Sequence, residues 1–256
     1  AEIFGAGFDC DFFSASVWRN SVQSDEPVIQ PAVWADLTYF DPFWIGFSVW
    51  QNYDLTSRRH DALKGGLTET DYGVHLGVTA WESEDEAMSL DVEIGHEWFV
   101  NQQVKSAYRE DYKNTAELYA KVTFNNEIVN VYGQVSWMYD DIGEYDSGFY
   151  YEVGFNKEFE LCDELTLGLD WNTSMVDGDY AAFMTGVDEA GFLGTTLKAY
   201  LSWAVTDWMS LVGTVAYTGV LNGSARQSLG DEGSGWQGDQ YRRDLLWGGV
   251  SLKFAF

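Results

Sequence analysis

The feature that most constrains the fold is a rhythm of alternating apolar and polar side chains that recurs along the 256-residue chain. About twelve segments of roughly 11 to 15 residues carry it, slightly longer than the 9 to 11 residues that a tilted strand needs to cross a bilayer. They lie near 5–18, 27–40, 44–55, 70–82, 88–100, 114–125, 128–140, 147–161, 165–177, 193–206, 209–221 and 243–256. Because successive side chains of a strand point to opposite faces, each segment predicts a strand with one apolar and one polar face.

The connections between these segments alternate in length. Short turns follow every second segment, at 41–42, 83–87, 125–127, 162–164 and 206–208. Longer connections occupy 19–26, 56–69, 101–113, 141–146, 178–192 and 222–242. An outer-membrane barrel has short turns at one end and long loops at the other, whereas a soluble Greek-key sandwich has no reason to keep this order. The pattern predicts one domain over 1–256, a 12-stranded antiparallel transmembrane up-and-down β-barrel with short periplasmic turns, longer extracellular loops and both termini in the periplasm.

The two faces of each predicted strand differ in charge. In the fifth segment Leu90, Val92 and Ile94 fall on one face, and Asp91 and Glu93 fall on the other. A carboxylate that faces lipid is unfavourable, so the charged face is predicted to line the lumen. The predicted lumen-lining residues are Asp36, Asp91, Glu93, Glu97, Glu117, Lys121, Glu152, Asp170, Lys198 and Lys253. A water-filled lumen of this composition favours cations. The alternative is an internal salt-bridge network, with Lys121 among Glu93, Glu97 and Glu117, that plugs a narrow barrel.

Aromatic residues gather near the predicted strand ends, in two belts separated by Val, Leu and Ala. Interfacial girdles of membrane proteins have this arrangement because Trp and Tyr rings favour the boundary between lipid and water. The predicted girdle residues are Trp44, Trp81, Trp98, Trp137, Trp203, Trp208, Phe254 and Phe256.

Charge and composition narrow the partners. The net charge of -27 makes nucleic acid an improbable partner. No apolar run is long enough for a spanning helix, and the start at Ala1-Glu2 is that expected of an exported protein after removal of its signal peptide. Basic residues cluster in or beside the long loops, where lipopolysaccharide phosphates or ordinary solvent would surround them. They are Arg19, Arg58, Arg59, Lys64, Lys105, Arg109, Lys113, Arg226, Arg242 and Arg243.

The sequence offers little for catalysis or metal binding. His60, His75 and His96 are the available histidines, and no Ser stands at a matching depth beside His96, so no enzyme activity is expected. The acidic run 140–146 lacks the ligand periodicity of an EF-hand, and solvated charge is the favoured interpretation. Cys10 and Cys162 permit one disulfide, although two unbonded thiols are favoured.

Two segments carry a resemblance to known proteins. The final strand, 246–256, ends on Phe256 and resembles the closing segment of bacterial outer-membrane β-barrels, which serves there as an assembly signal. The segment 18–30 resembles the first loop of the TorF-type putative porins, which carry Arg-Gly, then Gln-Ser-Asp, then Pro-x-x-Gln. Asn20 replaces the glycine of that pattern, so the turn after Arg19 is expected to differ. The resemblance implies an outer-membrane barrel of porin type and assigns no catalytic or binding residues.

Together these features predict a passive outer-membrane channel of a Gram-negative-type bacterium for small cationic or neutral solutes. It would need no cofactor and no metal. The expected partners are outer-membrane lipid, lipopolysaccharide, the barrel-assembly machinery, the solutes and, as in many porins, further copies of the chain. The alternatives are a non-conducting barrel that acts as an anchor, receptor or envelope-structural protein through its loops, a lipid-modifying enzyme that uses His96, and a soluble sugar-binding sandwich.

Overall fold

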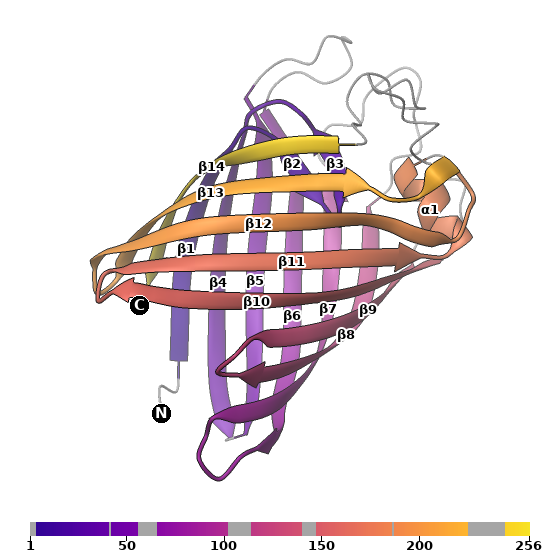
Figure 1. Ribbon diagram of the computed structural model, residues 1–256. Helices are drawn as coiled ribbons and strands as arrows, with labels where there is room; N and C mark the ends of the chain where they lie inside the picture. Colours follow the sequence, from indigo (N-terminus) through magenta and orange to yellow (C-terminus); the bar gives the residue numbers. More distant parts are fainter. Residues whose placement is uncertain are drawn as a thin grey trace.

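The computed structural model describes residues 4–40, 42–55, 66–101, 114–139, 147–185, 187–224 and 244–256, and its main feature is a closed antiparallel barrel (Figure 1). Twelve strands form the wall. They are β1 (Phe4–Phe13), β4 (Val28–Phe40), β5 (Phe43–Asp54), β6 (Gly66–Glu82), β7 (Met88–Asn101), β8 (Thr115–Asn126), β9 (Asn130–Tyr139), β10 (Gly148–Cys162), β11 (Leu165–Val176), β12 (Gly191–Thr206), β13 (Met209–Val220) and β14 (Asp244–Ala255).

Each wall strand pairs with its neighbours along the chain, and β1 pairs with β14 to close the sheet. In the closing seam Asp9 is opposite Lys253 and Phe8 is opposite Phe254. Closure removes the unpaired strand edges that an open sheet would expose. The predicted 12-stranded antiparallel barrel is therefore confirmed.

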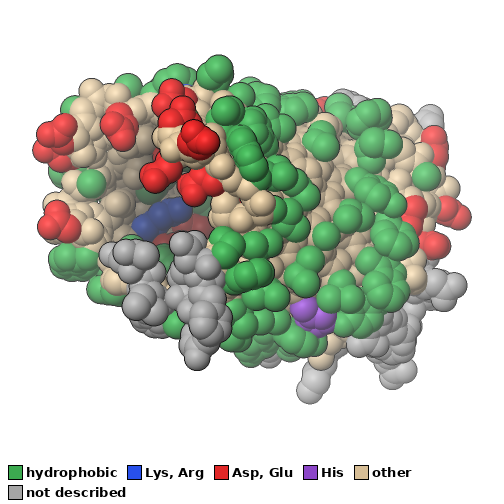
Figure 2. Space-filling view, turned by 90° about the horizontal axis from the view of Figure 1, so that it is seen from below, with side chains coloured by type: hydrophobic (Ala, Val, Ile, Leu, Met, Phe, Trp, Pro, Cys, Tyr) green, Lys and Arg blue, Asp and Glu red, His purple; other side chains and the backbone are tan. Residues whose placement is uncertain are grey.

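The alternation of side chains sorts the wall into two surfaces. Large apolar residues point outward and are half exposed, among them Ile94 at 56%, Leu197 at 54% and Val215 at 53%. The residues between them point inward, where Glu117 and Ser136 are fully buried. Figure 2 shows the outward apolar side chains spread over much of the wall, with backbone and small side chains between them. A surface of this kind is suited to lipid, because a soluble monomer rarely exposes so large an apolar patch.

Four of the hairpins contain a register shift near their short turn, between Thr38 and Phe40, Thr79 and Trp81, Glu160 and Cys162, and Ala204 and Thr206. The shift in β6 has a visible consequence. Thr79 pairs with Asp91 on the inner face, and two residues later Trp81 pairs with Leu90 on the outer face. A bulge changes which face a side chain points to. It therefore places Trp81 on the outer face, although simple alternation from Thr79 would turn it inward.

Two elements lie outside the predicted strands. The first predicted segment ends as a wall strand at Phe13, and the connection after it forms a small hairpin of β2 (Ser16–Trp18) and β3 (Ser21–Ser24). The connection between β11 and β12 contains the helix α1 (Gly178–Thr185). The Asp177 carboxylate caps this helix by accepting a hydrogen bond from the Tyr180 backbone N–H at 2.9 Å. In the described part of the chain, no helix is long and apolar enough to cross a membrane.

Candidate functional site in the barrel lumen

All ten residues predicted to line the lumen lie on the inner face. Register and contacts place them there: Asp36 lies 3.4 Å from His75 (Oδ1 to Nε2), and Lys198 pairs with Asp170 at 2.6 Å (Nζ to Oδ2). Asp91 accepts a hydrogen bond from Thr79 at 2.9 Å. Glu93, Glu97, Glu117, Lys121, Glu152 and Lys253 follow from the same alternation. The inner wall is therefore rich in carboxylates.

Seven of the eight predicted girdle residues lie on the outer face, and one does not. Trp81, Trp98, Trp137, Trp203, Trp208 and Phe256 are exposed there, and Phe254 packs against Phe8 and Trp208. Trp44 instead lies on the inner face, because a Cβ added at inward-facing Gly77 would overlap its ring. The girdle prediction for Trp44 is wrong. Its neighbour Phe43, 49% exposed, occupies the outward position at this turn.

The internal salt-bridge network predicted around Lys121 as the alternative to an open lumen is only partly present. Lys121 is the cross-strand partner of Glu93, and its Nζ lies 5.1 Å from the centre of the Tyr132 ring. Glu117 pairs with a different cation, the guanidinium of Arg19. The sequence predicts Arg19 in an outer loop, surrounded by lipopolysaccharide phosphates or by solvent. That prediction is wrong, since the Arg19 side chain is 9% exposed.

Arg19 reaches the lumen because the β2–β3 hairpin folds inward. Its Nη2 donates a hydrogen bond to Glu117 Oε1, and its guanidinium carbon lies 4.3 Å from the centre of the Tyr150 ring and 5.0 Å from that of Trp18. Burial opposes the charged form, but the field of Tyr180, Glu117, Tyr150 and Glu97 holds the pKa of Arg19 above its ordinary value. The guanidinium therefore remains charged between two aromatic faces.

The hairpin tip extends to the opposite wall. Asn20 Nδ2 donates a hydrogen bond to Ser174 Oγ on β11 at 3.0 Å, and a Cβ added at Gly194 on β12 would lie 2.7 Å from the Asn20 backbone oxygen. Arg19 and Asn20 form the turn with φ of 49° and 60°. Positive φ at both central residues defines the tight turn that fits hairpin twist, and a residue such as Arg adopts it at a cost of about 1 kcal/mol or more. Contacts with the wall hold the turn in this conformation.

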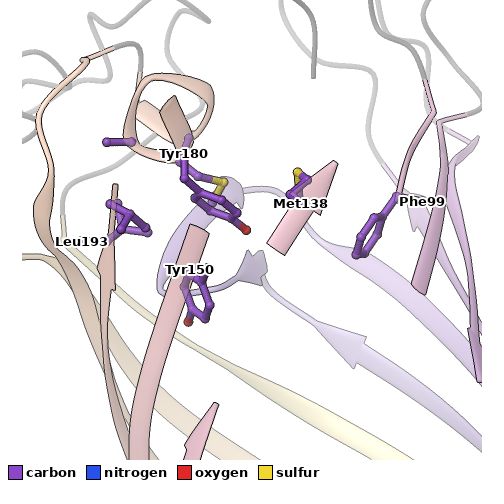
Figure 3. Packing of buried hydrophobic residues seen from close by; sticks show 8 residues of the cluster. Phe99, Met138, Tyr150, Tyr180 and Leu193 are labelled. Atoms are coloured by element: carbon purple, nitrogen blue, oxygen red, sulfur yellow. The ribbon is translucent and has the colours of Figure 1, made fainter. Parts of the chain in front are cut away.

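An aromatic cluster fills the lumen beside this hairpin, at the end with the long loops. Figure 3 shows Tyr150 of β10, Tyr180 of α1 and Leu193 of β12 close together, with Met138 of β9 and Phe99 of β7 further along the wall. Trp18 of the hairpin packs edge-on against Phe99, with ring centroids 5.5 Å apart. Tyr180, Met138, Tyr150 and Leu193 are at most 1% exposed. The hairpin, the helix and the cluster therefore narrow this end of the barrel.

The other end of the barrel contains a hollow. Figure 2, seen from below, shows it on the left, bordered by acidic side chains and with a basic patch in its depth. Aromatic rings lie flat against its inner wall, each over a glycine of the neighbouring strand: Trp34 over Gly7, Trp44 over Gly77, Tyr119 over Gly95, Tyr132 over Gly154 and Tyr200 over Gly168. All five rings are half-buried. The hydroxyls of the three tyrosines among them each donate a hydrogen bond to a carboxylate: Tyr119 to Glu93, Tyr132 to Glu152 and Tyr200 to Glu158.

Sequence reasoning missed both the inward hairpin and these rings. A sequence pattern could have predicted the ring contacts, because Tyr and Trp recur at inward positions opposite glycines. For the inward fold of the hairpin, the sequence offers only the turn-forming pair Arg19-Asn20.

Several predictions concern residues outside the main site. His96 lies on the outer face, beside the Trp98 ring, and its Nε2 is hydrogen-bonded to the Tyr139 hydroxyl. Cys10 and Cys162 are free thiols. The acidic run 140–146, His60 and the loop cations Arg58, Arg59, Lys64, Lys105, Arg109, Lys113, Arg226, Arg242 and Arg243 lie outside the described residues. Among the residues that are described, no group of three or more His, Cys, Asp or Glu could hold a metal ion.

Comparison with solved structures agrees with this architecture. The barrel superimposes on the NanC porin with a TM-score of 0.57 at 8% identity, covering 96% of this chain and 98% of that one. For the COG4313 outer membrane channel from Pseudomonas putida F1 the TM-score is 0.55 at 10% identity, with 99% and 94% covered. Outer membrane phospholipase A from Escherichia coli gives 0.52 at 13% identity, with 97% and 92% covered.

The chain has the fold of bacterial outer-membrane β-barrels. Identities this low relate the folds alone, and these barrels include both channels and a phospholipase. No family model and no curated protein matches the sequence. The resemblance of the first loop to the TorF-type putative porins therefore stays a prediction.

Proposed function

We propose that this protein is a porin-like outer-membrane channel for the passive diffusion of small solutes, with a preference for cations. The observation that carries the proposal is the hollow at the short-turn end, which acidic side chains border (Figure 2). The similar folds of the NanC porin and the COG4313 channel support it. In this orientation the short turns face the periplasm, and lipid with lipopolysaccharide surrounds the apolar outer face.

The cation preference rests on the balance of charge along the inner wall. Asp91 and Glu93 stand on the inner face of β7, with Lys121 opposite Glu93, and Asp36 of β4 stands beside His75 of β6. The low-dielectric wall strengthens the field of these carboxylates in the lumen. Lys198 is neutralised locally by Asp170. Arg19 is similarly paired with Glu117. The resulting negative potential attracts cations and lowers the local concentration of anions.

The test is the reversal potential of the purified barrel in planar bilayers under a KCl gradient. We expect single-channel current steps and a reversal potential that is shifted from zero toward the equilibrium potential of potassium. The variant Asp91→Asn/Glu93→Gln should move the reversal potential toward zero, and the outer-face variant Ile94→Val is the matched control. A barrel that is folded but gives no conductance would overturn the channel proposal, and a preference for chloride would overturn the charge argument.

A non-conducting barrel is the second candidate function, and one observation favours it. The β2–β3 hairpin, α1 and the aromatic cluster occupy the long-loop end of the lumen, where Tyr180 and Met138 are fully buried. If these elements stay in place, the protein would act through its loops as an anchor or receptor. Conductance that appears only when the hairpin is released would distinguish a gated channel from a permanently closed barrel.

We propose further that the barrel has no lipid-modifying activity. The hydroxyl that is hydrogen-bonded to His96 belongs to a tyrosine, Tyr139, and the cross-strand partners of His96 on the outer face are Val74 and Leu118. A hydrolase of this kind needs a nucleophile within hydrogen-bond reach of its base. Incubation of the folded barrel with phospholipid vesicles and calcium should release no fatty acid, and release that disappears in His96→Ala would refute this proposal.

A further inference from the structure

The lumen contains a repeated unit of a tyrosine ring, a glycine and a carboxylate. In each unit the ring covers a glycine on the next strand, and the tyrosine hydroxyl donates to a carboxylate beside it. Tyr132 and Glu152 form one unit at 2.7 Å, and Tyr200 and Glu158 form another at 2.5 Å. The ring presents its negatively polarised face to the lumen, and the carboxylate adds a full charge at its edge.

Two of these units already hold an ammonium group that belongs to the chain. Lys121 Nζ lies 5.1 Å from the centre of the Tyr132 ring, and Lys198 Nζ lies 5.7 Å from that of Tyr200. Both distances fall within the range of cation–π attraction. An alkylammonium therefore lies at cation–π distance from the ring of each of these two units, and that of Lys198 is also paired with Asp170.

In the third unit, formed by Tyr119 and Glu93, the cross-strand partner of Glu93 is Lys121, whose ammonium lies over the Tyr132 ring, and a second aromatic ring lies on the other side of Glu93. The Tyr119 hydroxyl donates to Glu93 Oε1 at 2.8 Å. The Trp44 ring occupies the side-chain space of Gly77, and Gly77 is the cross-strand partner of Glu93. The Trp44 ring therefore lies over the residue of β6 that is paired with Glu93. The Tyr119 ring lies over Gly95, two residues after Glu93 on β7. Among the described residues, no Lys or Arg lies at cation–π distance from either ring.

We propose that Trp44, Glu93 and Tyr119 form a binding site for a small organic ammonium ion in the lumen. Two aromatic faces around one carboxylate are the arrangement that recognises alkylated ammonium groups, because the rings attract the charge without competing for hydrogen bonds. The site takes a quaternary or alkylated ammonium solute. The proposal deepens the proposed function by naming the class of solute that this channel would favour.

The experiment measures equilibrium binding and needs no conduction. The barrel is refolded in detergent micelles, its folded state is checked by heat-modifiable gel mobility, and choline chloride is titrated by calorimetry. The neutral isostere 3,3-dimethylbutan-1-ol has the same shape without the charge. We expect choline to bind and the alcohol not to bind. Because binding is measured at equilibrium, a barrel that binds choline but fails to conduct would overturn the channel proposal and leave this one standing.

Variants test the residues. Glu93→Gln changes almost no volume, and we expect it to weaken choline binding by about tenfold or more. Trp44→Leu and Tyr119→Leu should each weaken it by about five- to thirty-fold. Trp203→Leu, which removes a tryptophan from the outer face, is the matched control and should leave the affinity unchanged. If Trp44→Leu fails to refold, Glu93→Gln still decides the question.

Three results would overturn the proposal. A folded wild-type barrel that does not bind choline has no such site. Equal binding of choline and its neutral isostere would indicate an apolar cavity. An unchanged affinity in Glu93→Gln would place the ammonium elsewhere in the lumen.

Discussion

The pairing of Arg19 with Glu117 should control whether the β2–β3 hairpin stays inside the barrel. Both side chains are removed from solvent, with 9% and 0% exposure. In Glu117→Gln the guanidinium remains buried and loses its opposite charge. Breaking a buried ion pair by removing one partner costs about 3–5 kcal/mol. We take the lower figure, about 3 kcal/mol, because the Trp18 and Tyr150 rings still attract the cation.

A change of about 3 kcal/mol shifts the equilibrium between a seated and a released hairpin by roughly two powers of ten. The assay is single-channel recording in planar bilayers, in which Glu117→Gln should raise the open fraction or the mean conductance above that of wild type. The barrel itself should remain folded, because the wall strands keep all their hydrogen bonds. Heat-modifiable mobility provides that control.

A double-mutant cycle separates the ion pair from incidental effects. Arg19→Met alone should also release the hairpin, since it leaves the Glu117 carboxylate buried without its cation. The double variant Arg19→Met/Glu117→Gln carries no uncompensated charge and should conduct more like wild type, with a coupling energy of about 2 kcal/mol. The reasoning would be refuted if Glu117→Gln conducts as wild type does, or if the effects of the two single variants simply add.

Three further predictions concern the wall and its turns. Gly168→Ala would force its new methyl group into the Tyr200 ring and should lower stability in urea by about 1–3 kcal/mol, whereas Gly213→Ala, with no atom within 4 Å of the added Cβ, should have little effect. Ile94→Lys on the outer face should lower stability by about 2–4 kcal/mol in bilayers, and the inner-face variant Gln134→Lys should cost far less; equal losses would contradict the assignment of the faces. In the turn after β6, hydrogen bonds from the Ser83 side chain and the Ala87 N–H hold the pKa of the Asp85 carboxyl below its ordinary value. These hydrogen bonds stabilise the turn at a pH above the ordinary pKa of an aspartate, and they are lost as the pH falls through the lowered pKa of Asp85. Ser83→Ala should therefore raise the pKa of Asp85 in an NMR titration. An unchanged pKa would exclude the Ser83 hydrogen bond as its cause.

The strand rhythm, the alternation in loop length and the sorting of charge followed from the sequence because they depend on local geometry. A period of two assigns each side chain of a strand to one face, and the carboxylates then identify the inner one. For this reason Glu93, Asp170 and Lys198 were placed correctly from their positions alone. The girdle prediction for Trp44 followed from its place beside a turn and not from this rule. The pairing of β5 with β6 is unbroken from Phe43 to Asn52, so alternation puts Trp44 on the inner face and Phe43 on the outer one.

The position of the Arg19 side chain inside the lumen could be decided only by the tertiary structure. Its ion-pair partner Glu117 is 98 residues away in the chain, and the ring of Tyr150 belongs to yet another strand. Sequence reasoning treats a cation in a long loop as solvated, since no local pattern distinguishes a loop that extends outward from one that folds back. Closure of the barrel brings the carboxylate and the ring to one place and makes the inward position favourable. The sequence by itself determined the wall and its two faces, and the tertiary structure decided what enters the space that the wall encloses, because that depends on contacts between strands distant along the chain.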